Sequence, residues 1–267
     1  MNMNKMMIAT ILSLFVVVSN AQQKEGKIIY EYSKTYKEKV KTGTISGNGM
    51  VIGSGEEAPA PPPDKYELLF GNNKMTMKKL KEEIKGMVFS GAIEFGASVN
   101  DVVFCDFGTG VNTTQKDVFN TLYLVDEPVV KLDWKMSGEK KTILKFTCQK
   151  ATATIIGKRI QGSMKDGKVV TVEVPDTTTM TAWFTTEIPV PAAPKVQGQL
   201  PGVVLELEEN TAFAVILYKA TALTDKVILA DIKPSAEGKK LSPDGFKKEI
   251  EAKKKEMETS GGIFRIN

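Results

Sequence analysis

The residue types that most often carry enzymatic chemistry are scarce in this sequence. Among its 267 residues there is no histidine, and the two cysteines are Cys105 and Cys148. Without histidine the chain lacks the general base of Ser-His-Asp and Cys-His catalytic sites. It also lacks the commonest protein ligand of zinc. Two well-separated cysteines do not form a structural zinc site. We therefore predict no catalytic residue, no metal site and no cofactor.

Carboxylates are the remaining groups that could act as acid and base. Adjacent acidic residues occur at Glu56-Glu57, Glu82-Glu83 and Glu208-Glu209. Neighbouring residues of a strand point to opposite faces, so such a pair does not converge on one substrate. A hydrolase that uses carboxylates is therefore the third and least favoured of three functional hypotheses.

The two cysteines leave a choice between a bridge and two separate thiols. Outside the cytoplasm Cys105 and Cys148 can form a disulfide. The alternative is two buried thiols that never meet, because strand residues this far apart can lie on different sheets.

The N-terminus has the pattern of a secretory signal peptide. Lys5 precedes an apolar run from Met6 to Val18, and the small residues Ser19 and Ala21 follow it. The run is too short for a membrane span, which needs about 20 residues. We predict a signal peptide at residues 1–21, cleavage before Gln22, and no membrane span afterwards. The protein would then be exported.

The net charge of the chain suggests no nucleic-acid partner. The full sequence carries +4, and removal of Lys5 with the signal peptide leaves 4 − 1 = +3. A charge this small favours solubility, and no base-stacking motif accompanies it.

Alternating apolar and polar residues predict strands along most of residues 22–267, which we treat as a single domain. The segment from Lys27 to Tyr36 alternates, and a hairpin pattern surrounds the turn at 71–73. Residues 77–87 also have helical spacing, so a short helix is an alternative there. Prolines predict an exposed loop near 53–64.

The C-terminal half continues the strand pattern and ends in a helix. Turns are predicted at Ser137–Lys140 and Glu209–Thr211, and a further strand within Asp225–Ser235. Ser242 as N-cap and Pro243 at the first position predict a helix near 242–259. The fold class is therefore mainly β, an antiparallel curved sheet or half-barrel with a C-terminal helix.

Several blocks of this sequence resemble the GLPGLI family of exported Bacteroidota proteins. The blocks that carry the resemblance are Cys148-Gln149-Lys150-Ala151, Ala182 to Pro189, and Leu200-Pro201-Gly202. Gln199 stands where the family has its first motif glycine, Ala193 replaces a glycine before Pro194, and the link between Cys148 and Trp183 is longer. The resemblance implies a divergent member that is exported to the periplasm or cell envelope of a Gram-negative bacterium, or secreted. It implies no activity.

The candidate ligand-binding residues are those of the aromatic and proline-rich stretch, namely Trp183, Phe184, Pro189, Leu200, Pro201 and Gly202. Exported curved sheets often hold an apolar ligand on the concave face. The leading hypothesis is therefore a non-catalytic binding or accessory protein whose partner is an apolar ligand, a peptide or an envelope protein. The second is an interaction module with a filled core. The alternative role for these residues is a buried aromatic beside a structural turn.

Overall fold

The computed structural model describes residues 23–37, 43–46, 49–52, 63–80, 101–118, 120–165 and 168–259. The predicted signal peptide at 1–21 and most of the predicted proline-rich loop, residues 53–62, lie outside these ranges.

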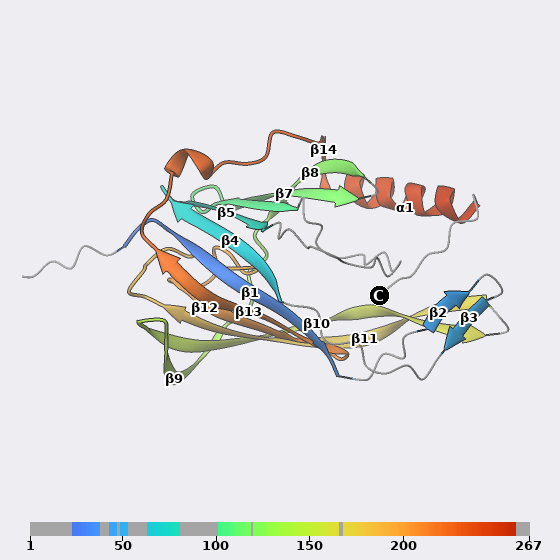
Figure 1. Cartoon of the computed structure of the whole chain (residues 1–267), viewed down its shortest axis with the longest axis horizontal. Coiled ribbons are helices and arrows are strands. Elements are labelled where there is room, and N and C mark those ends of the chain that lie inside the picture. Colours follow the sequence, from blue (N-terminus) through green and yellow to red (C-terminus); the bar gives the residue numbers. More distant parts are fainter. Residues whose placement is uncertain are drawn as a thin grey trace, which may run out of the picture.

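Strands dominate the described chain (Figure 1). Twelve of them form one sheet: β1 (Gly26–Tyr36), β4 (Asp64–Gly71), β5 (Lys74–Lys79), β6 (Val102–Asp106), β7 (Val111–Val118), β8 (Thr121–Pro128), β9 (Lys135–Ile143), β10 (Phe146–Lys165), β11 (Lys168–Thr185), β12 (Val203–Asn210), β13 (Ala214–Thr224) and β14 (Lys239–Leu241). A separate two-stranded sheet contains β2 (Gly43–Ser46) and β3 (Gly49–Ile52).

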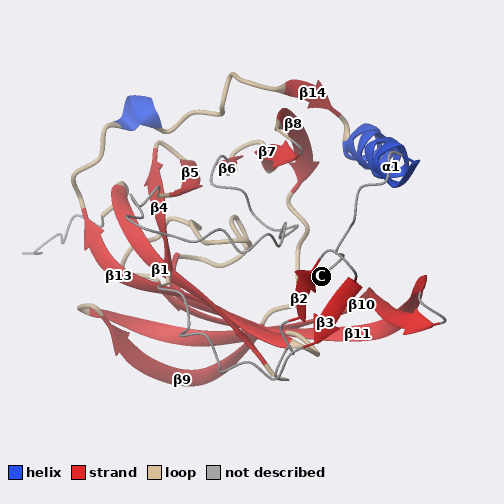
Figure 2. Cartoon of the chain, turned by 45° about the vertical axis from the view of Figure 1, so that its right-hand side comes forward, coloured by secondary structure: helices blue, strands red, loops and turns tan. Residues whose placement is uncertain are grey.

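The large sheet curls without closing (Figure 2). Its order is β14-β8-β7-β6-β5-β4-β1-β13-β12-β11-β10-β9, so β14 and β9 are its two edges. Every pairing is antiparallel except that of β14 with β8. The predicted mainly β fold with an antiparallel curved sheet is confirmed.

One face of the sheet is buried inside the curl because apolar residues alternate in register. Ile28 of β1 lies opposite Leu68 of β4, which lies opposite Met77 of β5, and all three are buried. Neighbouring positions such as Lys27 and Glu67 face the convex side. The core therefore follows from a period of two in the sequence.

The first and last long strands lie side by side at the centre of the sheet. β1 pairs with β13 from Lys27↔Thr224 to Tyr36↔Ala214. Across the buried face, the hydroxyl of Tyr30 donates a hydrogen bond of 2.5 Å to the carbonyl of Val204. This bond joins β1 to β12 over the intervening strand β13.

The segment after β13 covers part of the convex face instead of forming a strand. It contains the short 3-10 helix η1 (Leu229–Asp231), whose Leu229 packs against Gly71 together with Ile232. Ser235 then contacts the Gln115 side chain, and β14 joins the sheet. The strand predicted within Asp225–Ser235 is therefore wrong, because its apolar residues cover a sheet rather than pair with one.

The predicted C-terminal helix is confirmed as α1 (Pro243–Thr259). Pro243 begins it, and the Ser242 hydroxyl accepts a hydrogen bond of 3.1 Å from the Gly245 amide, as expected of an N-cap. The Phe246 ring packs edge-on against Tyr123 of β8, with ring centroids 5.4 Å apart. This contact fixes the helix at the β8 end of the sheet.

Two local predictions differ from the structure. Residues 137–140 do not form a turn but continue β9, and the chain reverses at Leu144–Lys145, where Leu144 has φ 54. A leucine rarely adopts that conformation, so composition does not reveal the turn.

The helical alternative for 77–87 fails at Met77–Lys79, which belong to β5. The remainder of that stretch lies outside the described residues beyond position 80.

We predict that Tyr30→Phe lowers the free energy of unfolding by about 1–2 kcal/mol, because the Val204 carbonyl loses its buried donor. Tyr123→Phe is the matched control. Tyr123 is equally buried, but its hydroxyl has no hydrogen-bond partner among the described residues. Its removal should cost nothing or stabilise the fold. Urea denaturation measures the free energy of unfolding of both variants. Equal losses of stability would contradict a stabilising role for the hydrogen bond between Tyr30 and Val204.

Candidate functional site

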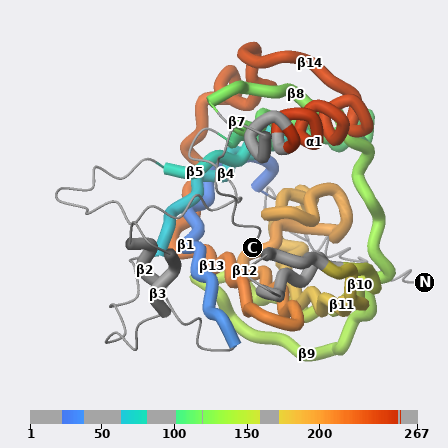
Figure 3. Tube along the Cα trace, turned by 90° about the vertical axis from the view of Figure 1, so that its right-hand side faces the viewer, coloured from blue at the N-terminus to red at the C-terminus, as the bar shows by residue number. Residues whose placement is uncertain are grey.

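The proline-rich connection between β11 and β12, residues 186–202, folds into the hollow of the curled sheet (light orange in Figure 3). We call it the plug loop. Most of its apolar side chains are buried. The buried side chains are Ile188, Val190, Ala192, Ala193, Pro194, Val196, Gln197 and Leu200. The interior of the sheet is therefore filled by this loop as well as by strand side chains.

The prolines shape the plug loop through tight local turns. The Val190 amide donates to the Ile188 carbonyl at 2.8 Å, and the Ala192 amide donates to the Val190 carbonyl at 2.7 Å. Hydrogen bonds between residues two apart define γ-turns. The fixed φ angle of proline restricts the backbone of this loop to conformations of this compact kind. The loop thus provides hydrogen-bond partners for several of its own buried backbone groups.

The plug loop is also bonded back to the strand that follows it. The amide of Val203 donates to the Ile188 carbonyl at 3.1 Å, and the amide of Val204 donates to the Ala192 carbonyl at 3.0 Å. Gly202 lies so close to β11 that a Cβ atom there would be 2.0 Å from the Thr185 carbonyl oxygen. Only glycine fits at this position.

The predicted site residues do not gather in one place. Phe184 is buried inside the sheet, whereas Trp183 is half-buried and lies on the convex face, because successive strand residues alternate. Leu200 is buried, while Pro189 and Pro201 are exposed. Phe184, Leu200 and Gly202 have the structural role considered as the alternative. Trp183 lies apart from them, as the alternation of neighbouring strand residues requires.

The convex-face surroundings of Trp183 are charged. The Lys141 ammonium lies 4.3 Å from the indole centroid and 2.6 Å from a Glu206 carboxylate oxygen. Lys150 lies 5.8 Å from the same centroid and pairs with Glu139 at 2.9 Å. These contacts occupy the ring with the protein's own cations, so the arrangement resembles a cation–π and ion-pair cluster of a sheet surface.

Gln199 has a positioning role that the sequence alone did not indicate. Its side-chain oxygen accepts hydrogen bonds from the Leu132 amide at 2.9 Å and from the Trp134 indole at 3.0 Å. These donors belong to residues 129–134, the crossing that links β8 to β9. Gln199 thus holds the plug loop against a second segment.

Both cysteines are free, buried thiols. Burial raises the pKa of Cys105 to about 11, with a smaller contribution from Asp106. Burial also raises the pKa of Cys148 to about 11. At neutral pH neither thiol supplies the thiolate that a cysteine nucleophile requires.

A pocket of about 310 Å³ lies at the edge of the plug loop. We call it the plug pocket. Its walls come from the strand end and turn after β6, from the crossing and from the plug loop, through Cys105, Phe107, Val129, Lys131, Pro191 and Gly198. Lys131 is the only charged residue among those that line it. The sequence did not predict this site, because its residues come from three separate segments.

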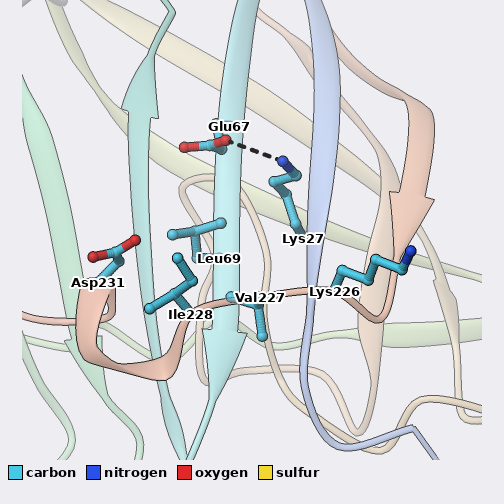
Figure 4. Close-up of a pocket in the computed structure, with 7 residues that line it drawn as sticks. All are labelled: Lys27, Glu67, Leu69, Lys226, Val227, Ile228 and Asp231. Atoms are coloured by element: carbon cyan, nitrogen blue, oxygen red, sulfur yellow. Dashed lines mark ion pairs between the residues drawn. The ribbon is translucent and has the colours of Figure 1, made fainter.

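A second pocket, of about 400 Å³, lies on the convex face beneath the segment that follows β13. Figure 4 shows Lys27 and Glu67 facing each other there, joined by an ion pair of 3.8 Å. Lys78 also contacts Glu67 at 3.5 Å. These opposite charges already pair with one another. They are therefore less available to a charged ligand than Lys131 of the plug pocket is.

The described residues contain no cluster of three or more metal-ligating side chains. Among the same residues, no helix is long and apolar enough to cross a membrane. The adjacent pair Glu208 and Glu209 lies on β12, where Glu209 contacts Lys195 of the plug loop. The other two acidic pairs lie outside the described ranges.

The middle of the chain is similar to an uncharacterised protein family. A family model described as a protein of unknown function, Porph_ging, matches residues 134–206. This segment begins at Trp134, contains the whole plug loop and ends within β12. None of the curated proteins matches the chain.

Two solved structures of PNGF-II, in different space groups, are similar to this chain. They show 14% and 13% sequence identity, with TM-scores of 0.49 and 0.48. Each alignment covers 84% of this chain and 32% of that chain, so the protein spans about a third of their length.

We predict that Gly202→Ala destabilises the protein by about 3 kcal/mol or more, because its methyl group would overlap the Thr185 carbonyl. Gly157→Ala in β10 is the control, since a Cβ atom there meets nothing within 4 Å. Thermal and urea denaturation compare the two variants. A tolerated alanine at 202 would show that the plug loop does not require this close approach.

The thiol pKa values predict an alkaline loss of stability. A thiol with an ordinary value of 9.0 ionises in the unfolded chain before the folded thiols do near 11. Their stabilising contribution is therefore complete below pH 9 and is lost as the pH rises towards 11. In the double variant Cys105→Ala/Cys148→Ala, the free energy of unfolding should decline less steeply between pH 9 and pH 11. Urea denaturation at a series of pH values measures this decline. An unchanged pH dependence of the free energy of unfolding would show that the two thiols do not cause the decline.

Proposed function

We propose that this protein is an exported, non-catalytic accessory protein of the bacterial envelope that binds a small ligand in the plug pocket. The observation that carries the proposal is that the plug loop supplies one wall of this pocket, through Pro191 and Gly198. Because the loop covers much of the inner face, the site suits a small ligand at its rim rather than a large one in the hollow.

The chemistry of the lining supports a ligand with an apolar body and one anionic group. Phe107, Val129 and Pro191 supply apolar surface, and Lys131 supplies a single cation. Cys105 remains a protonated thiol at neutral pH, so it presents neither negative charge nor a reactive nucleophile. These properties favour binding over catalysis.

Family and location form part of the same proposal. We infer that the chain is a divergent GLPGLI-family protein. The support is the match of an uncharacterised family to residues 134–206, which includes the Cys148–Ala151 block and the plug loop. The signal-peptide pattern at residues 1–21 supports export and an envelope location.

An interaction module is the second candidate function. The filled interior favours it, since this hypothesis requires a packed core and an exposed apolar surface. Ile155, Ile156 and Val172, on the long strands β10 and β11, supply such exposed apolar residues.

The binding proposal predicts a preference for decanoate over decanol in calorimetric titrations of the chain that begins at Gln22. Lys131→Gln should weaken decanoate binding by about tenfold, the expected effect of a lost charged contact, and leave decanol unaffected. Lys135→Gln removes an exposed cation of β9 outside the pocket and is the control. Equal effects of the two variants, or no binding of either probe, would refute this assignment of the site.

A further inference from the structure

Lys131 is the charged group that the plug pocket presents to a ligand, and it lies on a segment without regular structure. Residues 129–134, the crossing between β8 and β9, contain no helix and no strand. The Lys131 side chain is exposed and forms no ion pair or hydrogen bond within the described chain. Fixing a long lysine side chain costs about 2 kcal/mol of conformational freedom. The availability of this cation to a ligand therefore depends on what fixes the backbone on either side of it.

Two hydrogen bonds fix the crossing on either side of Lys131. The Val129 amide donates to the Gly110 carbonyl at 3.1 Å, which attaches one end of the crossing to the turn after β6. The Leu132 amide donates to the Gln199 side-chain oxygen at 2.9 Å, which attaches the other end to the plug loop. Only residues 130 and 131 lie between these two attachments. The cation is therefore carried on a short span that is held against two walls of the pocket.

The Gln199 side chain can hold this span because its own position is fixed. The Trp134 indole donates to the same side-chain oxygen at 3.0 Å. Two donors at one atom require the oxygen of Gln199, and not its amino group, to face the crossing. On the plug loop, the preceding residue Gly198 lines the pocket, and its amide donates to the Pro191 carbonyl at 2.8 Å. Gln199 therefore joins one wall of the pocket to the segment that carries Lys131.

We propose that Gln199 is a positioning residue that makes the plug pocket selective for anionic ligands, because it holds Lys131 at the site. Gln199 is not among the residues that line the pocket, so it acts through the crossing and not by contact with the ligand. Without its side-chain oxygen, the crossing keeps its attachment at Val129 and loses the one at Leu132. The cation can then turn to solvent, while the apolar walls stay in place. The inference rests on the proposed binding function and names a residue that determines its charge selectivity.

Amide hydrogen exchange, followed by NMR, tests the attachment without any ligand. In the chain that begins at Gln22, we expect the Leu132 amide to exchange about tenfold faster in Gln199→Met than in the unchanged protein. Methionine has a similar length but is only a weak acceptor. The Val129 amide is the internal control and should keep its rate, which also shows that the variant is folded. An equal rate for Leu132 in both proteins would overturn the role of Gln199, whatever the pocket binds.

Calorimetric titrations with decanoate and decanol test the charge selectivity. Gln199→Met should weaken decanoate binding by about fivefold and leave decanol binding unchanged, because only the anionic probe uses the cation. In the Lys131→Gln background, the same substitution should have no further effect on decanoate binding, since the group that Gln199 positions is already absent.

The outcomes of these titrations separate a positioning role from a purely structural one. Equal weakening of both probes by Gln199→Met, or additive losses in the double variant, would overturn the positioning role and leave the pocket as a binding site. Binding of neither probe to the unchanged protein would refute the pocket and, with it, this inference.

Discussion

An open, curled sheet has an apolar inner face that must be covered, and this requirement determines the rest of the structure. Twelve strands curve without their two edge strands pairing, so the apolar face is turned inward but not closed off by the sheet itself. The plug loop covers it by folding inward with its apolar residues buried. A buried loop normally leaves backbone groups without partners. Here the γ-turns, together with the bonds from Val203 and Val204 back to the loop, satisfy several of them.

The plug loop also couples parts of the molecule that are distant in sequence. Its return to β12 requires the close approach of Gly202 to Thr185, and its Gln199 holds the crossing between β8 and β9. The plug pocket has walls from these same segments. Its shape therefore depends on the packing of the core, which joins the stability of the fold to any binding at this site.

Exposed apolar side chains distinguish one part of the large sheet from the rest. The described body of the sheet has a buried inner face, and its convex face is partly covered by the segment after β13. The outer parts of β10 and β11, in contrast, carry the exposed side chains of Ile155, Ile156 and Val172. They belong to the long link between Cys148 and Trp183.

The sequence by itself determined the elements that depend on local patterns. Alternation predicted β1 and the hairpin of β4 and β5, and Ser242 with Pro243 predicted the start of α1. These features depend on residues close together in the chain. The absence of histidine likewise removed whole classes of active site without any coordinates.

Only the tertiary structure decided where the predicted site residues lie. Trp183 and Phe184 are adjacent in sequence, yet the pleat sends them to opposite faces. The turn at Leu144, the cover provided by Leu229 and Ile232, and the partners of Gln199 all depend on contacts between distant segments. Local propensity carries no information about such contacts, because the free energy that fixes them comes from burial and pairing across the folded chain.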